Sequence, residues 1–114
     1  MQARLQYLLA MNEITATELK KMMDNKEDFQ LIDVREEYEA REANIGGKLI
    51  PMGTVMEHLD EIPKDKKVVV HCRSGKRSAS VIQALEQQHG YTNLYNLKGG
   101  IMAYAEDVDP SLLR

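Results

Sequence analysis

The chain is poor in the residues that make disulfides and large aromatic cores. Its 114 residues include one cysteine, no tryptophan, one phenylalanine and three prolines. A single cysteine excludes an internal disulfide and is typical of proteins in a reducing compartment. The chain also lacks an apolar run of membrane-spanning length and the pattern of a secretory signal. These absences predict a cytoplasmic protein that is not associated with a membrane.

Charge and histidine content exclude two further classes of protein. The net charge of −3 lacks the excess of basic residues that a nucleic-acid-binding module needs. The three histidines are scattered and no cysteine pair exists, so no metal site is predicted. The length and the 43% hydrophobic content fit one globular domain, which we place at residues 12–114. Residues 1–11 have leucines between polar residues, and we interpret them as an N-terminal arm or a linker.

Strand-like and helix-like patterns alternate along the chain at short spacing. Two of the helices are predicted to begin with capping boxes, Thr15 with Glu18 and Thr54 with Glu57. The predicted strands are residues 13–14, 29–32, 48–50, 68–70 and 94–97, and the predicted helices are residues 15–25, 36–41, 54–59 and 78–89. This alternation predicts an α/β domain with a central, mostly parallel sheet and helices on both faces.

The only cysteine lies between a predicted buried strand and a predicted helix. Residues 68–70 are three valines, and Cys72 opens a short basic loop that ends at Arg77. Free backbone amides and the helix dipole favour an anion where a strand leads into a helix. Arg73, Lys76 and Arg77 add positive charge. These conditions lower a cysteine pKa, so Cys72 is predicted to be a nucleophile.

Two other roles of Cys72 are an inert core residue and one member of a catalytic pair with His71. A lone cysteine is often an inert residue of the core, but the polar and basic residues that follow Cys72 are not a core sequence. His71 precedes Cys72 directly and therefore points to the opposite side of the strand. A catalytic pair between Cys72 and His71 is not expected.

Several motifs along residues 13–109 resemble those of the rhodanese-like sulfurtransferase family. The loop from Cys72 to Arg77 has the six-residue length of that family's catalytic loop, and residues 31–36 are similar to its I/V-D-V-R-E segment. Residues 43–51 match a third motif in spacing but not in residues. Gly99 and Gly100 match a fourth, with Tyr104 where tryptophan is usual. Residues 105–110 resemble the tail of rhodanese domains fused to E1-like adenylyltransferases.

The resemblance implies a rhodanese-like fold and a sulfurtransferase. Cys72 would take sulfane sulfur from thiosulfate or another persulfide, and the amides of the loop would hold the terminal sulfur. This persulfide would be the only covalent intermediate, with no separate cofactor. The acceptor would be a thiol or a sulfur-carrier protein, and a cysteine desulfurase would be a possible donor. The loop residues expected to bind substrate are Arg73, Ser74, Gly75, Lys76 and Arg77.

Two charged residues end the second predicted strand, at the edge of the sheet where the thiol loop also lies. Asp33 is expected to orient a backbone amide or a loop arginine, with an inward-turned Arg77 as one option. Arg35 is expected to add positive potential. The alternative is that both residues only hold the loop together, because structural ion pairs are common at such sites.

Two other functions were considered. Residues 71–78 look much like the His-Cys-x-x-Gly-x-x-Arg-Ser signature of tyrosine phosphatases, but only four residues separate Cys72 from Arg77 instead of five. The shorter ring of amides suits one extra sulfur better than a phosphate. The other alternative is a rhodanese fold that serves as a binding or persulfide-sensing module without thiosulfate activity.

Overall fold

The computed structural model describes residues 11–113 and contains one sheet of five parallel strands. The sheet order is β1-β5-β4-β2-β3, with β4 in the centre. The strands are β1 (Glu13–Ile14), β2 (Phe29–Asp33), β3 (Lys48–Leu49), β4 (Lys67–His71) and β5 (Leu94–Leu97). The predicted α/β class with a parallel sheet is confirmed. The predicted arm at residues 1–11 lies outside the described residues except for Met11, which packs against the core.

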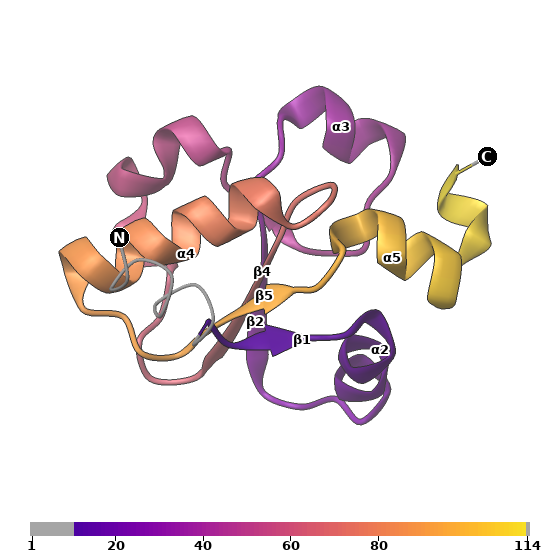
Figure 1. Cartoon of the computed structure of the whole chain (residues 1–114), viewed down its shortest axis with the longest axis horizontal. Helices are drawn as coiled ribbons and strands as arrows, with labels where there is room; N and C mark the ends of the chain where they lie inside the picture. Colours follow the sequence, from indigo (N-terminus) through magenta and orange to yellow (C-terminus); the bar gives the residue numbers. More distant parts are fainter. Residues whose placement is uncertain (1–10, 114) are drawn as a thin grey trace.

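Helices cover both faces of the sheet, as predicted (Figure 1). The α-helices are α2 (Ala16–Asp24), α3 (Glu37–Glu42), α4 (Lys76–His89) and α5 (Gly100–Asp107), and three 3₁₀ helices are η1 (Met52–Glu57), η2 (Leu59–Glu61) and η3 (Pro110–Leu113). In Figure 1, α4 and α2 lie on opposite sides of the strands. Within residues 11–113, no helix combines the length and the apolar character needed to cross a membrane.

Each face of the sheet carries its own apolar cluster. The β4 side chains alternate between the faces: Val68 and Val70 pack on the side of α4, and Val69 packs on the side of α2 and α5. All three valines are at most 1% exposed. A central parallel strand that is buried on both faces explains why this stretch is uniformly apolar.

One of the two predicted capping boxes is present. The Thr15 hydroxyl accepts a hydrogen bond from the Glu18 amide at 3.1 Å, and the Glu18 carboxylate accepts one from the Thr15 amide at 2.9 Å. The second prediction, a helix over residues 54–59 with Thr54 as its cap, is wrong. Thr54 lies inside η1, and its amide and hydroxyl both donate to the Pro51 carbonyl. The tight turn begins earlier than the sequence pattern indicated because Pro51 already starts it.

Two helix starts differ from the prediction. Helix α4 begins at Lys76 rather than at Ser78, so the last two residues of the thiol loop form its first turn. Helix α5 was not predicted, because Gly99 and Gly100 indicated only a turn. The amides of Ile101 and Met102 in α5 donate to carbonyls of the thiol loop. This tertiary contact helps α5 to begin at a glycine, which is a poor helix former.

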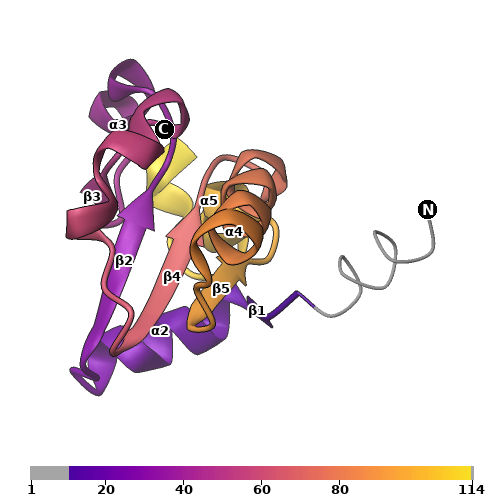
Figure 2. The same ribbon diagram turned by 90° about the vertical axis from the view of Figure 1, so that its left-hand side faces the viewer.

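The chain order places the loops after β2 and β4 at the same edge of the sheet. From β2 the chain moves outward to β3, whereas β4 leads to β5 on its other side. The loops that leave the carboxyl ends of these two neighbouring strands therefore diverge, which is where α/β sheets form binding crevices. Figure 2 shows β2 pointing toward α3 at this end of the molecule.

Candidate active site

The thiol loop follows the central strand directly. Cys72 comes after the last residue of β4, and its side chain is 1% exposed. Gly75 has a φ of 104°, a left-handed conformation that favours glycine, and it precedes the first turn of α4. This turn folds the chain back so that backbone amides of the loop face the sulfur. The predicted arrangement of strand, loop and helix is present.

Backbone amides and one hydroxyl surround the Cys72 sulfur. The Gly75 amide donates to Sγ at 3.1 Å, and the Ser78 amide lies 3.4 Å from the same atom. The Ser78 hydroxyl oxygen is also 3.4 Å from Sγ. These groups come from the loop and from the first turn of α4, where amides have no partner within the helix. The site is thus built to hold an anionic sulfur.

The hydrogen bonds decide the direction in which the pKa of Cys72 moves. Burial raises the pKa of the thiol, because a charge is less stable away from water. Hydrogen bonds from the Ser78 hydroxyl and from the amides of Ser78, Gly75 and Ser74 lower it. The hydrogen bonds outweigh burial, so the pKa of Cys72 lies below its ordinary value. A larger fraction of thiolate is therefore present at neutral pH.

Two buried polar residues of this site were not predicted. Ser78 is fully buried and donates its hydroxyl to the Asn96 side-chain oxygen at 2.6 Å. The Asn96 amide group donates to the Gly75 carbonyl at 3.1 Å. A sequence signal did exist for both: Ser78 lies on the same helix face as Val81 and Ile82, and Asn96 interrupts an apolar strand. Buried polar residues of this kind usually have a specific partner.

Helix α5 fixes the backbone of the thiol loop. The Ile101 amide donates to the Cys72 carbonyl at 2.9 Å, and the Met102 amide donates to the Arg73 carbonyl at 3.1 Å. A Cβ atom at Gly100 would lie 2.3 Å from the Arg73 carbonyl oxygen and 2.6 Å from that of Cys72. Only glycine permits this approach, so the predicted close approach at the glycine pair is confirmed.

Arg77 has a different partner from the one considered for it. Its guanidinium forms two hydrogen bonds with the Glu39 carboxylate of α3, at 2.7 and 2.8 Å, and does not turn inward to Asp33. No sequence pattern singles out Glu39 as the partner, because it lies 38 residues away in a segment rich in glutamate. The Arg77 guanidinium lowers the pKa of Glu39 to about 2.

Asp33 and Arg35 form a buried ion pair with each other. The Asp33 carboxylate accepts from the Arg35 Nε at 2.9 Å, from its Nη2 at 2.8 Å and from its backbone amide at 3.0 Å. The Arg35 guanidinium also donates to the carbonyl of Glu39, within α3, and to that of Ala43, which follows the helix. The expected free positive potential of Arg35 is therefore neutralised, and the pair supports α3 instead of contacting the sulfur.

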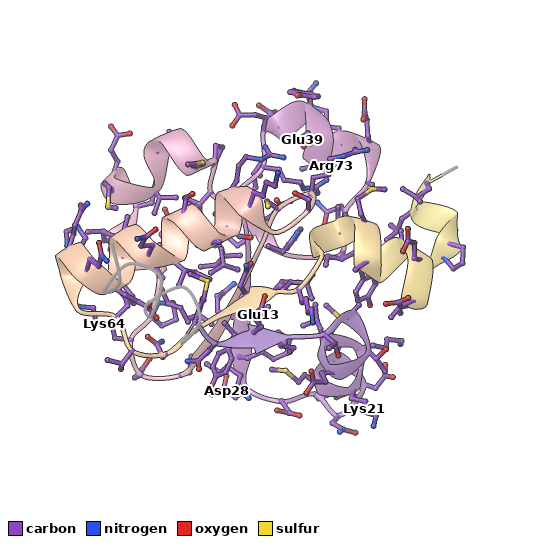
Figure 3. All side chains as sticks on the ribbon, in the orientation of Figure 1. Glu13, Lys21, Asp28, Glu39, Lys64 and Arg73 are labelled. Atoms are coloured by element: carbon purple, nitrogen blue, oxygen red, sulfur yellow. The ribbon has the colours of Figure 1, made fainter. Side chains whose placement is uncertain are left out.

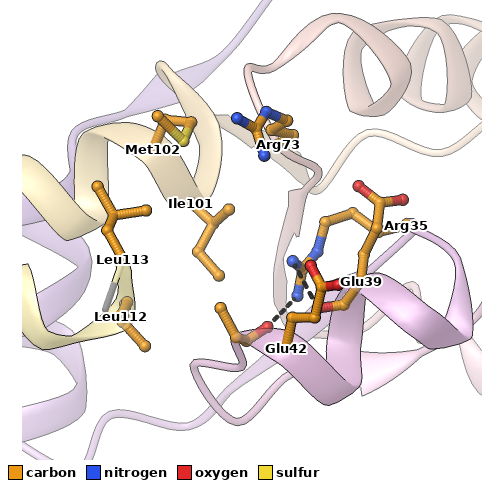
Figure 4. Close-up of a pocket in the computed structure, with 9 residues that line it drawn as sticks. Arg35, Glu39, Glu42, Arg73, Ile101, Met102, Leu112 and Leu113 are labelled. Carbon is orange, nitrogen blue, oxygen red and sulfur yellow. Dashed lines mark hydrogen bonds between the residues drawn. The ribbon is translucent and has the colours of Figure 1, made fainter.

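Other loop side chains face solvent. Arg73, Ser74 and Lys76 are exposed, and Arg73 lines a cavity of about 380 Å³ beside the loop. Figure 4 shows the charged side of this cavity facing an apolar side. Its other lining residues are Arg35, Glu39, Glu42, Ala43, Ile101, Met102, Leu112 and Leu113. Figure 3 shows Arg73 and Glu39 at the same end of the molecule. An anion that reaches the loop therefore meets an accessible guanidinium.

The His71 ring contacts the backbone of Cys72 and not its sulfur, because His71 Nδ1 lies 3.3 Å from the Cys72 carbonyl oxygen. Its ring is fully buried, and its Nε2 lies 3.9 Å from the Asp33 carboxylate. Burial lowers the pKa of His71, which favours the neutral ring. The expectation that His71 and Cys72 do not pair is confirmed. Among residues 11–113, no three histidine, cysteine, aspartate or glutamate side chains are grouped so that they could hold a metal ion.

Comparison with known proteins identifies the family. The family model of the rhodanese-like domain matches residues 15–107. The chain belongs to this family.

Relatives and solved structures agree with this family. A "Sulfurtransferase" of Allochromatium vinosum is 41% identical over 95 residues, which cover 82% of this chain and 88% of that protein. A rhodanese-like domain protein of Staphylococcus aureus has a crystal structure with a TM-score of 0.77 and 32% identity, covering 86% of this chain and 95% of that one.

The predicted likeness to fusion proteins is also found. The probable adenylyltransferase/sulfurtransferase MoeZ of Mycobacterium tuberculosis is 34% identical over 103 residues. The match covers 88% of this chain but only 26% of MoeZ. This chain therefore corresponds to one part of that longer protein.

Proposed function

We propose that this protein is a sulfurtransferase that moves sulfane sulfur from thiosulfate or a persulfide donor to a thiophilic acceptor. The observation that carries the proposal is the Cys72 sulfur at the base of a six-residue loop, with the Gly75 and Ser78 amides directed at it. The names of the relatives as sulfurtransferases support the same class of reaction. The four-residue spacing between Cys72 and Arg77 supports sulfur rather than phosphate chemistry.

The reaction has two halves, and its only covalent intermediate is a persulfide on Cys72. In the first half, the Cys72 thiolate attacks the outer sulfur of thiosulfate. A bond forms between the two sulfurs, and sulfite leaves with the electron pair of the broken sulfur–sulfur bond. In the second half, an acceptor such as cyanide attacks the terminal sulfur, and Cys72 leaves as a thiolate. The amides directed at the sulfur stabilise the negative charge in both halves.

The positions of the cations suggest how the donor binds. Arg73 and Lys76 are exposed at the loop, so they are available to an anionic donor. We assign donor binding to them and assign the holding of the terminal sulfur to the amides between Arg73 and Arg77. We assign the acceptor role to a thiol or a sulfur-carrier protein, with a cysteine desulfurase as a further donor. The single cysteine supports a location in the reducing cytoplasm.

The proposal predicts that treatment with thiosulfate adds one sulfur atom to the reduced protein. Intact-mass measurement should show the gain, and cyanide should reverse it. The Cys72→Ser variant should gain nothing and should lose about 1,000-fold or more of the turnover, because the nucleophile is removed. Turnover by Cys72→Ser at the rate of the original chain would refute the proposal.

A second variant tests the role of Arg73. Arg73→Ala should raise the KM for thiosulfate about tenfold and change kcat much less, because one charge-assisted contact with the donor is lost. Arg41→Ala is the matched control, since Arg41 is an exposed arginine whose ion pair is with Glu37 on α3. An equal effect of both variants would indicate general electrostatics and would remove the specific role of Arg73.

One observation favours the alternative of a binding or persulfide-sensing module. Cys72 is only 1% exposed, so a small donor must reach a well-shielded sulfur. If thiosulfate adds no sulfur, the persulfide form of a cysteine desulfurase should be tried as the donor. Sulfur gained only from that protein would restrict the enzyme to protein persulfides. No gain from either donor would support the binding module.

A further inference from the structure

Ser78 lies between the reactive sulfur and Asn96. Its hydroxyl oxygen is 3.4 Å from the Cys72 sulfur and 2.6 Å from the Asn96 side-chain oxygen. All three side chains are at most 5% exposed, so water cannot easily replace these contacts. The buried hydroxyl thus has two neighbours that compete for one proton.

The orientation of Asn96 fixes the direction of its hydrogen bond. The Asn96 side-chain nitrogen donates to the Gly75 carbonyl at 3.1 Å, which leaves the side-chain oxygen facing Ser78. That oxygen can only accept. A serine hydroxyl has one hydrogen to donate, and it cannot give this hydrogen to Asn96 and to the sulfur at the same time.

We propose that the Ser78 hydroxyl switches between two acceptors. It donates its hydrogen to the Asn96 side-chain oxygen while the Cys72 sulfur is uncharged, and it donates to that sulfur when Cys72 becomes a thiolate. The proposal rests on the sulfurtransferase function and extends it to a residue that contacts the reacting atom. Ser78 is then a catalytic residue, and Asn96 is a positioning residue that acts through it.

The two halves of the reaction need this donor at different times. In the persulfide, the Cys72 sulfur is bonded to carbon and to the terminal sulfur and carries no charge. The Ser78 hydroxyl therefore keeps its hydrogen bond to the Asn96 side-chain oxygen. When an acceptor takes the terminal sulfur, the sulfur–sulfur bond breaks and Cys72 receives the electron pair. The hydroxyl then stabilises the leaving thiolate. When the thiolate attacks a donor, the same stabilisation makes it less nucleophilic, so the gain in that half is smaller.

Other groups around the sulfur do not replace this donor. The nearby cations are Arg73, Lys76 and Arg77, of which the last is paired with Glu39 of α3. Within residues 11–113, no hydrogen bond joins any of these groups to the Ser78 hydroxyl. The Gly75 and Ser78 amides face the sulfur whatever its charge. Of the donors described here, only the Ser78 hydroxyl has a competing acceptor, the Asn96 side-chain oxygen, that can take its hydrogen bond away from the sulfur.

The first experiment compares the two half-reactions in Ser78→Ala. Discharge of the isolated persulfide by cyanide, followed by intact mass, should slow about 10- to 100-fold, because the leaving thiolate loses a donor. Loading by thiosulfate, at a pH where Cys72 is fully ionised, should change by no more than about threefold. Ser78→Thr, which keeps the hydroxyl, should restore discharge. Ser80→Ala is the control, since Ser80 is exposed on the same helix. Equal slowing of both halves would overturn the proposal.

The second experiment removes the competing acceptor. Asn96→Ala should leave the hydroxyl free to donate to the sulfur, so the pKa of Cys72 should fall, whereas Ser78→Ala should raise it. The loop should keep its shape in Asn96→Ala, because the Gly75 carbonyl also accepts from the Ala79 amide at 3.1 Å. In the Ser78→Ala background, Asn96→Ala should have no further effect. A rise in pKa in both single variants would overturn the proposal.

This second experiment does not depend on sulfur transfer. Cys72 is the only cysteine, so the pH dependence of alkylation by iodoacetamide reports its ionisation alone. If the pKa of Cys72 falls in Asn96→Ala and rises in Ser78→Ala but no sulfur is ever loaded, the proposed role of the Ser78 hydroxyl stands and the proposed function fails. If sulfur is loaded but the shifts are absent, the function stands and the switch fails.

Discussion

The reactivity of the Cys72 sulfur depends on the hydrogen-bond donors that the backbone places around it. Its side chain is buried, yet the hydroxyl and amide of Ser78 and the amide of Gly75 contact it. Burial alone would make the thiol inert, as for an ordinary core cysteine. The difference between an inert and a reactive cysteine therefore depends on a few donors within 3.4 Å of the sulfur.

The lowered pKa of Cys72 predicts two pH effects. In the folded protein, the rate of alkylation by iodoacetamide should rise with pH at a midpoint below that of the same chain unfolded in urea. Because the folded pKa is the lower one, the thiolate contributes stability at pH values above the unfolded pKa, and this contribution is lost as the pH falls through the folded pKa. A midpoint at or above that of the unfolded chain would contradict this account of the loop amides.

At the scale of elements, α5 and the thiol loop depend on each other. The first amides of α5 donate to the carbonyls of Cys72 and Arg73, and those carbonyls hold the loop in place in return. Gly100 makes this contact possible because it has no side chain. Gly100 thus serves the active site although it is 28 residues away from Cys72 in the sequence.

Gly100→Ala should destabilise the protein by about 2–4 kcal/mol and abolish persulfide formation. The added Cβ would lie 2.3 Å from the Arg73 carbonyl oxygen, so the loop or α5 must move. Chemical denaturation and intact mass after thiosulfate measure the two effects. Gly53→Ala is the matched control, because a Cβ at Gly53 would meet no atom within 4 Å. Normal stability and loading in Gly100→Ala would show that the contact is dispensable.

Helix α3 is held by polar contacts rather than by apolar packing. None of its residues is buried. Arg35 binds the carbonyls of Glu39 and Ala43, and Arg77 binds the Glu39 carboxylate. These two arginines thus hold α3 at the edge of the sheet that carries the thiol loop. One of them follows β2, and the other lies in the first turn of α4. The attachment of α3 depends on charge and therefore on pH.

At the scale of the whole molecule, the Glu39–Arg77 pair links stability to acid. The pKa of Glu39 is about 2 in the folded protein, against an ordinary value of 4.5. The pair therefore stabilises the fold above about pH 4.5, and this contribution is lost as the pH falls from about 4.5 to about 2. Glu39→Gln should lower the free energy of unfolding by about 1 kcal/mol at neutral pH. The difference from the original chain should vanish near pH 2.

Denaturation curves of both chains across this pH range measure that effect. Glu37→Gln is a suitable control, because Glu37 is also on α3 and paired with an arginine, but its side chain is 71% exposed. An exposed pair of this kind adds little to stability. A loss in Glu39→Gln that stays the same down to pH 2 would show that packing, and not charge, explains it.

The features that depend on local pattern could be predicted from the amino-acid sequence. Strand and helix periodicity predicted the α/β class, and the order of β4, the loop and α4 predicted a thiolate site at Cys72. The Thr15 capping box was also readable, because it depends on a short stretch of chain. The glycine pair indicated a close backbone approach but not its partner, the thiol loop.

The pairing of distant residues could not be predicted, because it depends on how the elements pack in three dimensions. Arg77 pairs with Glu39 and not with Asp33, and Asn96 reaches Ser78. Many glutamates were equally available to Arg77 in the sequence, and only the position of α3 beside the first turn of α4 selects one of them. Partners of long-range polar contacts are set by the fold, whereas local patterns need only their own neighbours.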